Sequence, residues 1–427
     1  MASVDLGALL SGKRVIACVG AGGVGKTTLS AALGVAAARQ GRKTLVLTVD
    51  PARRLANALG LASFDEQVQR IPVGHFADQG VSVAVPLDVA MLNVKQTFDR
   101  LVTHFAQSDE SRERILSHPF YKQASTTLAG TQEYMAMSRL YECVTEHDYD
   151  LVVLDTPPSK HALDFIEAPD RLVALLDSPA FRLLLASTGR GAAGARGLLR
   201  PGSVVVRGLG RFTGTEMFSQ LLSFFASLSE TFDGFIGRAR AVRALLRSDA
   251  AACLIVSACD STTIDEGFYL RERLRHEEME VAAWLLNRVS ASVDLPAGTD
   301  MQALTRRLRT ALAAANGPDI AAQVAVVATS LAKRARRDRA LMDELAERVA
   351  DATAVLPVAR RAKEPTTLAE LSDLADELLR TSPVVGRSHP TPVAAAMASA
   401  TLADEDTNGG TAPDARRHRA TTERRAK

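Results

Sequence analysis

Two observations in the 427-residue sequence predict an α/β fold, with a mostly parallel sheet covered by helices on both faces. The first is a series of short apolar runs separated by segments of helical periodicity, which is typical of strands buried on both sides. The runs are residues 14–20, 43–50, 81–88, 150–158, 251–258, 281–289, 324–330 and 352–358. The second is a glycine-rich turn between the first run and an Ala- and Leu-rich helix. Such sheets bind ligands beyond the carboxyl ends of their strands, so the polar residues there are the candidates for function.

The turn after the first run fits the phosphate-binding pattern G-x-x-x-x-G-K-[ST]. Its residues are Gly20, Ala21, Gly22, Gly23, Val24, Gly25, Lys26 and Thr27, followed by Thr28. Glycines let successive backbone N–H groups surround a phosphate, and the next helix adds the positive end of its dipole. We expect Lys26 to reach the β- and γ-phosphates of ATP and the Thr27 hydroxyl to ligate Mg²⁺. The alternative is a glycine-rich turn without a ligand.

Composition excludes several classes of protein. A net charge of +2 argues against a dedicated nucleic-acid surface, so no specific nucleic acid is expected. The four cysteines, Cys18, Cys143, Cys253 and Cys259, form no C-x-x-C pair, which indicates a reducing compartment and buried thiols. Neither a signal peptide nor a run of about 18 apolar residues is evident. We therefore expect a cytoplasmic protein that is at most peripheral to a membrane.

Two aspartates end apolar runs. Asp155 precedes Thr156, Pro157 and Pro158, and an Asp in this place is the acidic group that holds Mg²⁺ beside a phosphate loop. The constrained turn after it is a candidate for sensing the γ-phosphate. Asp50 ends the second run, where a carboxylate can orient or deprotonate an attacking water. Capping of the next helix is the competing interpretation of Asp50.

Later segments are less specific. Asn287 ends the run at 281–289, where its amide can pair with an adenine edge or serve as a turn residue, and Glu266 lies near the start of the preceding helix. Residues 170–247 are predicted to be a helical insertion. Its Phe-rich helix is interpreted as part of the subdomain core, and an exposed groove for an apolar client is the second interpretation. The mixed charges of the basic helix at 331–350 favour a solvated face, and a surface for an anionic membrane or partner is the second interpretation. Residues 381–427 are predicted to be a disordered tail with a basic end.

Taken together, the motifs GAGGVGKTT, TVDPA and DTPPSKHAL with Asn287 resemble the ArsA-type anion-pump ATPases and the related ATPase that targets tail-anchored membrane proteins. The resemblance covers roughly residues 10–380 and implies the deviant phosphate-loop NTPase fold of the SIMIBI type, within one domain of residues 1–380. It implies that Asp50 acts on the attacking water and that Asn287 binds adenine. It also implies that Glu266 contacts nucleotide from the dimer partner, and that the backbone near Pro357 lies beside the adenine.

The segments GTQEYMAM, DTPPS and ALDFIEAPDRL are most similar to one member of the paired ArsA-like ATPases of actinobacteria. The family usually carries a second lysine directly after the first loop glycine, which crosses a dimer to the partner's phosphates. This chain has Ala21 there. We therefore expect a heterodimer with a lysine-bearing paralogue, a homodimer being the alternative. Because no C-x-x-C motif and no evident cysteine triad exist, a zinc-bridged dimer and arsenite transport are not supported.

The resemblance predicts a Mg²⁺-dependent dimeric ATPase whose nucleotide cycle drives the binding of a client or of a membrane-associated partner. Two other classes compete with it. The first is a positioning ATPase of the MinD/ParA type, which also carries a D-x-P-P switch. The second is a nucleotide-binding regulatory subunit, which requires that the alanine at position 21 outweigh the retained Lys26, Thr27, Asp50 and Asp155.

Overall fold

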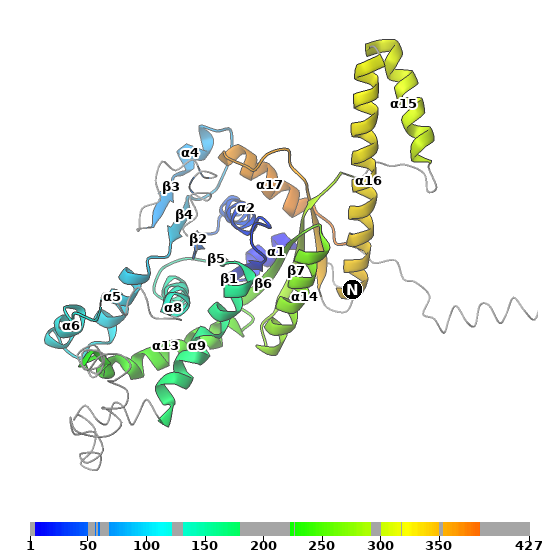
Figure 1. Ribbon diagram of the computed structural model, residues 1–427. Coiled ribbons are helices and arrows are strands. Elements are labelled where there is room, and N and C mark those ends of the chain that lie inside the picture. Colours follow the sequence, from blue (N-terminus) through cyan, green and yellow to red (C-terminus); the bar gives the residue numbers. More distant parts are fainter. Residues whose placement is uncertain are drawn as a thin grey trace, which may run out of the picture. The chain divides into compact units, whose positions relative to one another are not determined.

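The computed structural model (Figure 1) describes residues 5–49, 56, 59, 68–121, 131–179, 223–225, 227–291, 300–316, 318–349 and 353–384. By its contacts the chain divides into a unit of Met1–Gly386 and a unit of Arg387–Lys427, and all described residues belong to the first. Among the sequence predictions, Asp50 and nearly all of the tail at 381–427 fall outside the described residues.

A sheet of eight strands forms the centre of the first unit. Its strands, in spatial order, are β3 (Gln69–Ile71), β4 (Leu87–Met91), β2 (Thr44–Thr48), β5 (Leu151–Asp155), β1 (Val15–Gly20), β6 (Ala251–Ala258), β7 (Val281–Val289) and β8 (Ala354–Ala359). All neighbouring pairs are parallel except β3 with β4. The parallel strands therefore end at one edge, and the predicted α/β class is confirmed.

Helices connect the strands and cover both faces of the sheet (Figure 1). They are α1 (Leu6–Gly12), α2 (Lys26–Arg39), α4 (Val73–Ala77), α5 (Val94–Phe105), α6 (Asp109–Leu116), α8 (Thr131–Thr145), α9 (Ser159–Asp177), the 3₁₀ turn η1 (Ser229–Thr231), α13 (Phe232–Leu246), α14 (Ser261–His276), α15 (Met301–Asn316), α16 (Pro318–Val349) and α17 (Leu368–Arg380).

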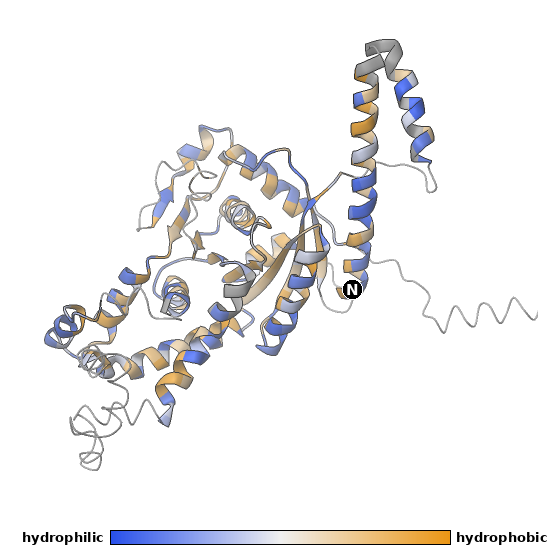
Figure 2. Ribbon diagram, viewed as in Figure 1, coloured by the Kyte–Doolittle hydropathy of each residue, from blue (hydrophilic) through white to orange (hydrophobic). Residues whose placement is uncertain are grey.

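Alternation along the strands separates two apolar cores. Ile16 and Cys18 of β1 face the core shared with α1, α2 and α17, whereas Val15, Ala17 and Val19 face the core shared with α8, α13, α14 and α16. Successive side chains of a strand point to opposite faces, so a strand buried on both sides must be apolar throughout. This is why the strands are mostly apolar in Figure 2 and why they were recognisable in the sequence.

Two predicted strands differ from the structure. Residues 324–330 are helical and belong to α16, so the strand prediction there was wrong. The strand predicted at 81–88 begins only at Leu87 and continues to Met91. Pro86 directly precedes it, and proline has no N–H to donate to a neighbouring strand.

A third apolar cluster joins the helices of the region predicted as an insertion. It contains Phe224, Phe232 and Phe235, all buried, packed with Phe98 of α5 and Tyr134 of α8. The described part of the Phe-rich segment is therefore core, as predicted. A cavity of about 470 Å³ opens beside it, lined by aromatic and leucine side chains with Glu133, Asp164 and Arg171. Residues 180–222 of the predicted insertion lie outside the described residues.

Trp284 of β7 is fully buried and packs directly against α14. Its Nε1–H donates to Ser257 Oγ at 2.8 Å, and its ring lies 5.0 Å from that of Phe268 between centroids. A Cβ placed on Gly267 would overlap the indole. The close approach of α14 to the sheet thus requires a glycine at this position.

We therefore predict that Gly267→Ala lowers the free energy of unfolding by about 1–3 kcal/mol, the usual cost of overpacking a core. Urea titration followed by circular dichroism measures this change. Gly237→Ala is the matched control, because Gly237 is also helical but has open space around its Cα. Helix propensity favours alanine at both sites. Equal effects of the two substitutions would contradict the steric explanation.

Candidate functional site

The glycine-rich loop lies where β1 ends and α2 begins, at the carboxyl edge of the sheet. Gly25 caps α2 with φ 100°, a left-handed conformation that favours glycine. A Cβ at Gly25 would also overlap the amide of Asn287, which comes from β7. The loop conformation therefore depends on glycine for two reasons, and it leaves the first N–H groups of α2 available to an anion.

Lys26, the loop lysine, is buried and folds back over the loop. Its Nζ donates to the carbonyl oxygens of Gly20 at 3.0 Å and Ala21 at 2.8 Å. The side chain is 7% exposed, so the ammonium lies within the loop and not in bulk solvent. A cation held this way lies close to any phosphate that the loop binds.

Asp155 joins three elements of the site. Its Oδ2 accepts hydrogen bonds from the hydroxyl of Thr27 at 2.7 Å and from that of Thr48 at 3.0 Å. Its backbone carbonyl accepts from the N–H of Val49 at 3.2 Å. The predicted pairing of Thr27 with Asp155 is therefore present in the geometry, and Thr48 is a further partner. A hydroxyl beside a carboxylate provides the hard oxygen donors that Mg²⁺ prefers.

The turn after Asp155 lies against the loop. The Thr156 hydroxyl donates to the carbonyl of Cys18 at 2.8 Å, which attaches the turn to β1. A Cβ on Gly22 would be 3.7 Å from Pro158 Cβ, so the proline is adjacent to the loop. Helix α9 starts at Ser159, the next residue. Pro158, which lies against the loop, is thus followed directly by the first residue of α9.

Asn287 braces the loop from the side of β7. Its Nδ2 donates to the Val24 carbonyl at 2.8 Å, and its Oδ1 accepts from the N–H of Arg288 at 2.8 Å. Arg288 has φ 62°, a left-handed conformation uncommon for a residue with a side chain. In this geometry the amide of Asn287 contacts the loop itself, a contact that its sequence position did not predict.

A cavity of about 190 Å³ adjoins Asn287. It is lined by Gly25, Thr28, Leu29, Asn287, Arg288, Val358, Ala359, Arg361, Ala362, Lys363, Glu364, Pro365 and Leu374. Two hydrogen bonds fix the wall after β8, because Glu377 accepts from the Ala359 N–H at 2.5 Å and from Arg361 at 2.9 Å. The basic side chains of this wall, Arg361 and Lys363, were missed in the sequence analysis. The signal for them was the polar segment directly after the last strand.

Two predicted residues, Pro357 and Glu266, do not line this cavity. Pro357 is in β8, one residue before the lining residues Val358 and Ala359. Glu266 is in the second turn of α14, five residues after the helix begins at Ser261. The backbone directly after Pro357 therefore lines the cavity, whereas Glu266 lies on α14 and contributes nothing to its lining.

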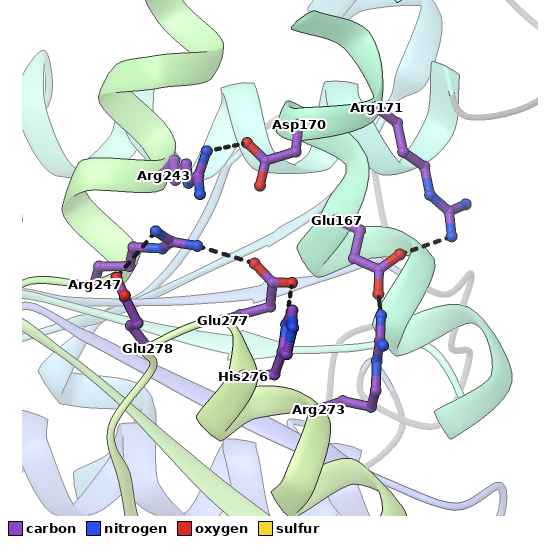
Figure 3. A network of polar contacts seen from close by, with 9 residues as sticks. All are labelled: Glu167, Asp170, Arg171, Arg243, Arg247, Arg273, His276, Glu277 and Glu278. Atoms are coloured by element: carbon purple, nitrogen blue, oxygen red, sulfur yellow. Dashed lines mark hydrogen bonds and ion pairs between the residues drawn. The ribbon is translucent and has the colours of Figure 1, made fainter. Parts of the chain in front are cut away.

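A network of charged side chains joins α9 to α13 and α14 (Figure 3). Glu167 of α9 accepts from Arg171 at 2.9 Å and also from Arg273 of α14. Asp170 of α9 accepts from Arg243 of α13 at 2.7 Å. Directly after α13, Arg247 binds the carboxylates of Glu277 at 3.0 Å and Glu278 at 3.1 Å, just after α14. The helix that follows the Asp155 turn is therefore tied to both neighbours.

The four cysteines are free and buried. Burial raises the pKa of Cys18, Cys253 and Cys259 to about 12 and that of Cys143 to about 11, which keeps all four as thiols. Within the described part of the chain, no group of three or more His, Cys, Asp or Glu residues is arranged to hold a metal ion. The prediction of buried thiols is confirmed.

This arrangement of loop, helix, hydroxyl and carboxylate at the carboxyl edge of a parallel sheet defines a phosphate-loop nucleotide-binding fold. Residues 13–185 match the family described as anion-transporting ATPase. The match contains the loop and Asp155, and it supports the resemblance to the ArsA-type ATPases that the sequence predicted.

Individual relatives cover similar parts of the chain. The chain is 28% identical over 156 residues to ATPase ASNA1 homolog 2 of Paramecium tetraurelia, which is 35% of this chain and 42% of that protein. It is 31% identical over 162 residues to the ATPase ASNA1 homolog of Babesia bovis, 37% of this chain and 39% of that protein. With a putative arsenical pump-driving ATPase of Halobacterium salinarum it shares 29% over 193 residues, 43% of this chain and 27% of that protein. The matches thus span less than half the length of these relatives.

We predict that the Glu167 network stabilises the fold in a pH-dependent way. Burial alone would raise the pKa of Glu167, but the hydrogen bonds and charges of Arg273 and Arg171 outweigh it and lower the pKa below its ordinary value. A lowered pKa gives stability that is present above the ordinary pKa and is lost as the pH falls through the lowered pKa. Glu167→Gln should therefore cost about 1 kcal/mol at neutral pH, and the difference from the unaltered protein should shrink in the acid range.

Urea unfolding at neutral pH and at successively lower pH measures the effect of this substitution. Glu272→Gln is the matched control, because Glu272 lies on α14 next to Arg273 but is largely exposed, and its oxygen is as far as 3.9 Å from its partner Arg275. It should change stability little at any pH. A Glu167→Gln effect that stays constant with pH would contradict the charge-based explanation.

Proposed function

We propose that the protein is a Mg²⁺-dependent ATPase that acts as a dimer, and that its nucleotide cycle drives the binding of a client or partner. The observation that carries this proposal is the contact of Thr27 Oγ1 with Asp155 Oδ2 at 2.7 Å beside the loop. It brings together a helix N-terminus, a buried lysine and a pair of oxygen ligands. The names of the relatives, all ATPases, support the same activity.

In this proposal the loop N–H groups and the start of α2 bind the phosphates of ATP, and Lys26 shifts from the loop carbonyls toward the β- and γ-phosphates. Thr27 and Asp155 hold Mg²⁺, directly or through water. The ion neutralises charge that develops on the phosphate oxygens. Asp50 orients or deprotonates the attacking water. Support for Asp50 is that Val49, its neighbour, hydrogen-bonds to the backbone of Asp155 at the edge of the site.

The cavity beside Asn287 is proposed to receive the adenine. Its walls combine apolar Leu29 and Val358 with the amide of Asn287, a mixture suited to a flat base with polar edges. Asn287 Nδ2 already donates a hydrogen bond to the Val24 carbonyl. Adenine would therefore hydrogen-bond either to the same amide group or to the backbone near Pro357. The family role of Glu266, contact with nucleotide across the dimer, fits its position outside the cavity.

The proposed output passes through α9. This helix starts directly after Pro158, which adjoins the loop, and Glu167 and Asp170 tie it to α13 and α14. Loss of the γ-phosphate would release the turn, and the network would carry the movement of α9 to the helices around the Phe-rich cluster. These helices are therefore the proposed contact surface for the client and for the partner whose signal starts the cycle.

A heterodimer is proposed because Ala21 occupies the place of the crossing lysine. Ala21 is buried and belongs to the apolar core, so the loop carries no second cation there. A homodimer would lack both crossing lysines, whereas a lysine-bearing paralogue would supply one. This subunit would then receive a lysine and give none.

Two substitutions separate binding from turnover. Lys26→Ala should weaken ATP binding at least about tenfold, because charge-assisted hydrogen bonds to phosphate are lost. Asp50→Asn should leave ATP affinity within about threefold and lower turnover about 10²- to 10⁴-fold, the usual contribution of a general base. Binding is measured by titration calorimetry and turnover by phosphate release. Normal turnover of Asp50→Asn would remove its catalytic role.

A third substitution tests the metal site. Asp155→Asn should abolish the gain in ATP affinity that Mg²⁺ provides, while affinity in the presence of a chelator stays close to that of the unaltered protein. The control is Asp148→Asn, since Asp148 is exposed and pairs only with Lys43 among the described residues. An unchanged Mg²⁺ effect in Asp155→Asn would place the ion elsewhere.

The heterodimer is tested by steady-state ATP hydrolysis of this subunit alone, over a range of protein concentrations, and then with its lysine-bearing paralogue. A large gain with the paralogue is expected. Equal, concentration-dependent activity of the isolated subunit would show that a homodimer works without the crossing lysine. Nucleotide binding without hydrolysis in either state would favour a regulatory subunit instead.

A further inference from the structure

The first half of α16 exposes an apolar stripe. Ile320, Val324, Val327 and Leu331 are 45–57% exposed, and the intervals of four, three and four residues place them on one side of the helix. Val326 nearby is 63% exposed. These five make up most of the large apolar side chains exposed among the described residues, the others being scattered singly. In Figure 2 this part of the helix is mostly orange and is followed by hydrophilic residues.

Only the second half of α16 is held by the sheet. Met342, Leu345, Ala346 and Val349 enter the core on that face. Among the described side chains of the first half, the buried ones are Ala325 and Ala332, and α15 packs along this half. The side chains of the apolar stripe thus take no part in the packing of the core. Exposing a contiguous apolar strip to water is unfavourable.

Basic side chains lie on both helices of the hairpin. Residues 301–340 contain eight arginines and lysines, and the described side chains of all eight are exposed. They are Arg306, Arg307, Arg309, Lys333, Arg334, Arg336, Arg337 and Arg339. The two acidic residues in this range are Asp319 and Asp338, and Asp338 is buried, accepting from the Ser290 N–H at 3.0 Å. The whole chain has a net charge of +2, so the rest of it is acidic on balance.

The charges and the stripe lie at the same level of the hairpin. The hydroxyls of Thr305 on α15 and Thr329 on α16 are 2.6 Å apart, which sets the register of the two helices. Arg306 and Arg309 therefore lie on the helix beside Val326 and Val327. Residues 320–332 contain no charged residue, and the basic run of α16 starts directly after them, at Lys333.

This pattern selects one kind of partner. A second copy of the hairpin would bring the same positive charge and be repelled. A nucleic acid would use the charge but gain nothing from Ile, Val and Leu side chains. The surface of a bilayer with anionic lipids uses both, because apolar side chains enter the acyl boundary while Lys and Arg meet the headgroups.

We propose that the α15–α16 hairpin is a docking surface for anionic lipid bilayers. The apolar stripe enters the interface, and the arginines and lysines beside it bind the phosphates of the headgroups. Among the described residues, no helix is both long enough and apolar enough to cross a membrane. The site is remote in sequence from the phosphate loop and does not depend on the proposed ATPase activity.

The experiment is flotation of the full chain, without nucleotide, with lipid vesicles. One set contains about one third phosphatidylglycerol in phosphatidylcholine, and the other contains phosphatidylcholine alone. The bound fraction should be roughly tenfold higher with the anionic vesicles, and it should fall as salt rises from about 0.1 M to about 0.5 M. Equal flotation with both vesicles, or none with either, would overturn the proposal.

Two pairs of substitutions assign the effect to the hairpin. Val327→Ser with Leu331→Ser removes half of the stripe, and Arg334→Glu with Arg337→Glu reverses two charges. Each pair should lower the bound fraction roughly tenfold. The matched charge control is Arg112→Glu with Arg275→Glu, which makes the same change in net charge on a half-buried residue of α6 and an exposed residue of α14. Circular dichroism verifies that each variant is folded.

Two results would count against the hairpin. If the control pair lowers flotation as much as the hairpin charge reversal, net charge and not this surface explains the binding. If the chain instead binds DNA, and the serine pair leaves that binding unchanged while vesicles stay unbound, the surface serves nucleic acid and the proposal fails.

Discussion

The Asp155 carboxylate, held between the hydroxyls of Thr27 and Thr48, is the interaction on which the site depends. It connects the end of β5 with the first turn of α2 and the end of β2, three segments that are far apart in the chain. A buried carboxylate is costly unless hydrogen bonds satisfy it, and these two hydroxyls supply such bonds to Oδ2. The same atoms that stabilise this corner of the fold are oxygens that suit a magnesium ion, and structure and proposed chemistry therefore use one set of groups.

The strands around this corner were predictable because burial on both faces requires uninterrupted apolar residues. The run at 324–330 satisfied the same rule and was nevertheless helical. Its valines and alanines suit either state in isolation, and the length of the run does not distinguish them. The deciding contacts are those of α15 along the alanine side of α16, and they depend on a neighbouring helix that a local pattern does not show.

The candidate site shows the same division. Thr27, Lys26 and Asp155 follow from the spacing of motifs, because the loop and the strand end fix where these residues lie. The contact of Asn287 with Val24 does not follow, since it joins residues 263 positions apart and requires the left-handed backbone of Arg288. Arg361 and Lys363 of the cavity wall were missed for a related reason: a polar segment after a strand has the composition of any loop. Asp50 stays a prediction.

Trp284, the only tryptophan of the chain, is three residues before Asn287 on the same strand. Its indole is sealed between Phe268, Gly267 and the hydroxyl of Ser257. Intrinsic fluorescence excited at the tryptophan band therefore comes from one place, three residues before Asn287 along β7 and packed against α14. Trp284 is therefore an intrinsic fluorescent probe. A shift of its emission maximum would report displacement of β7 or α14 without any added label.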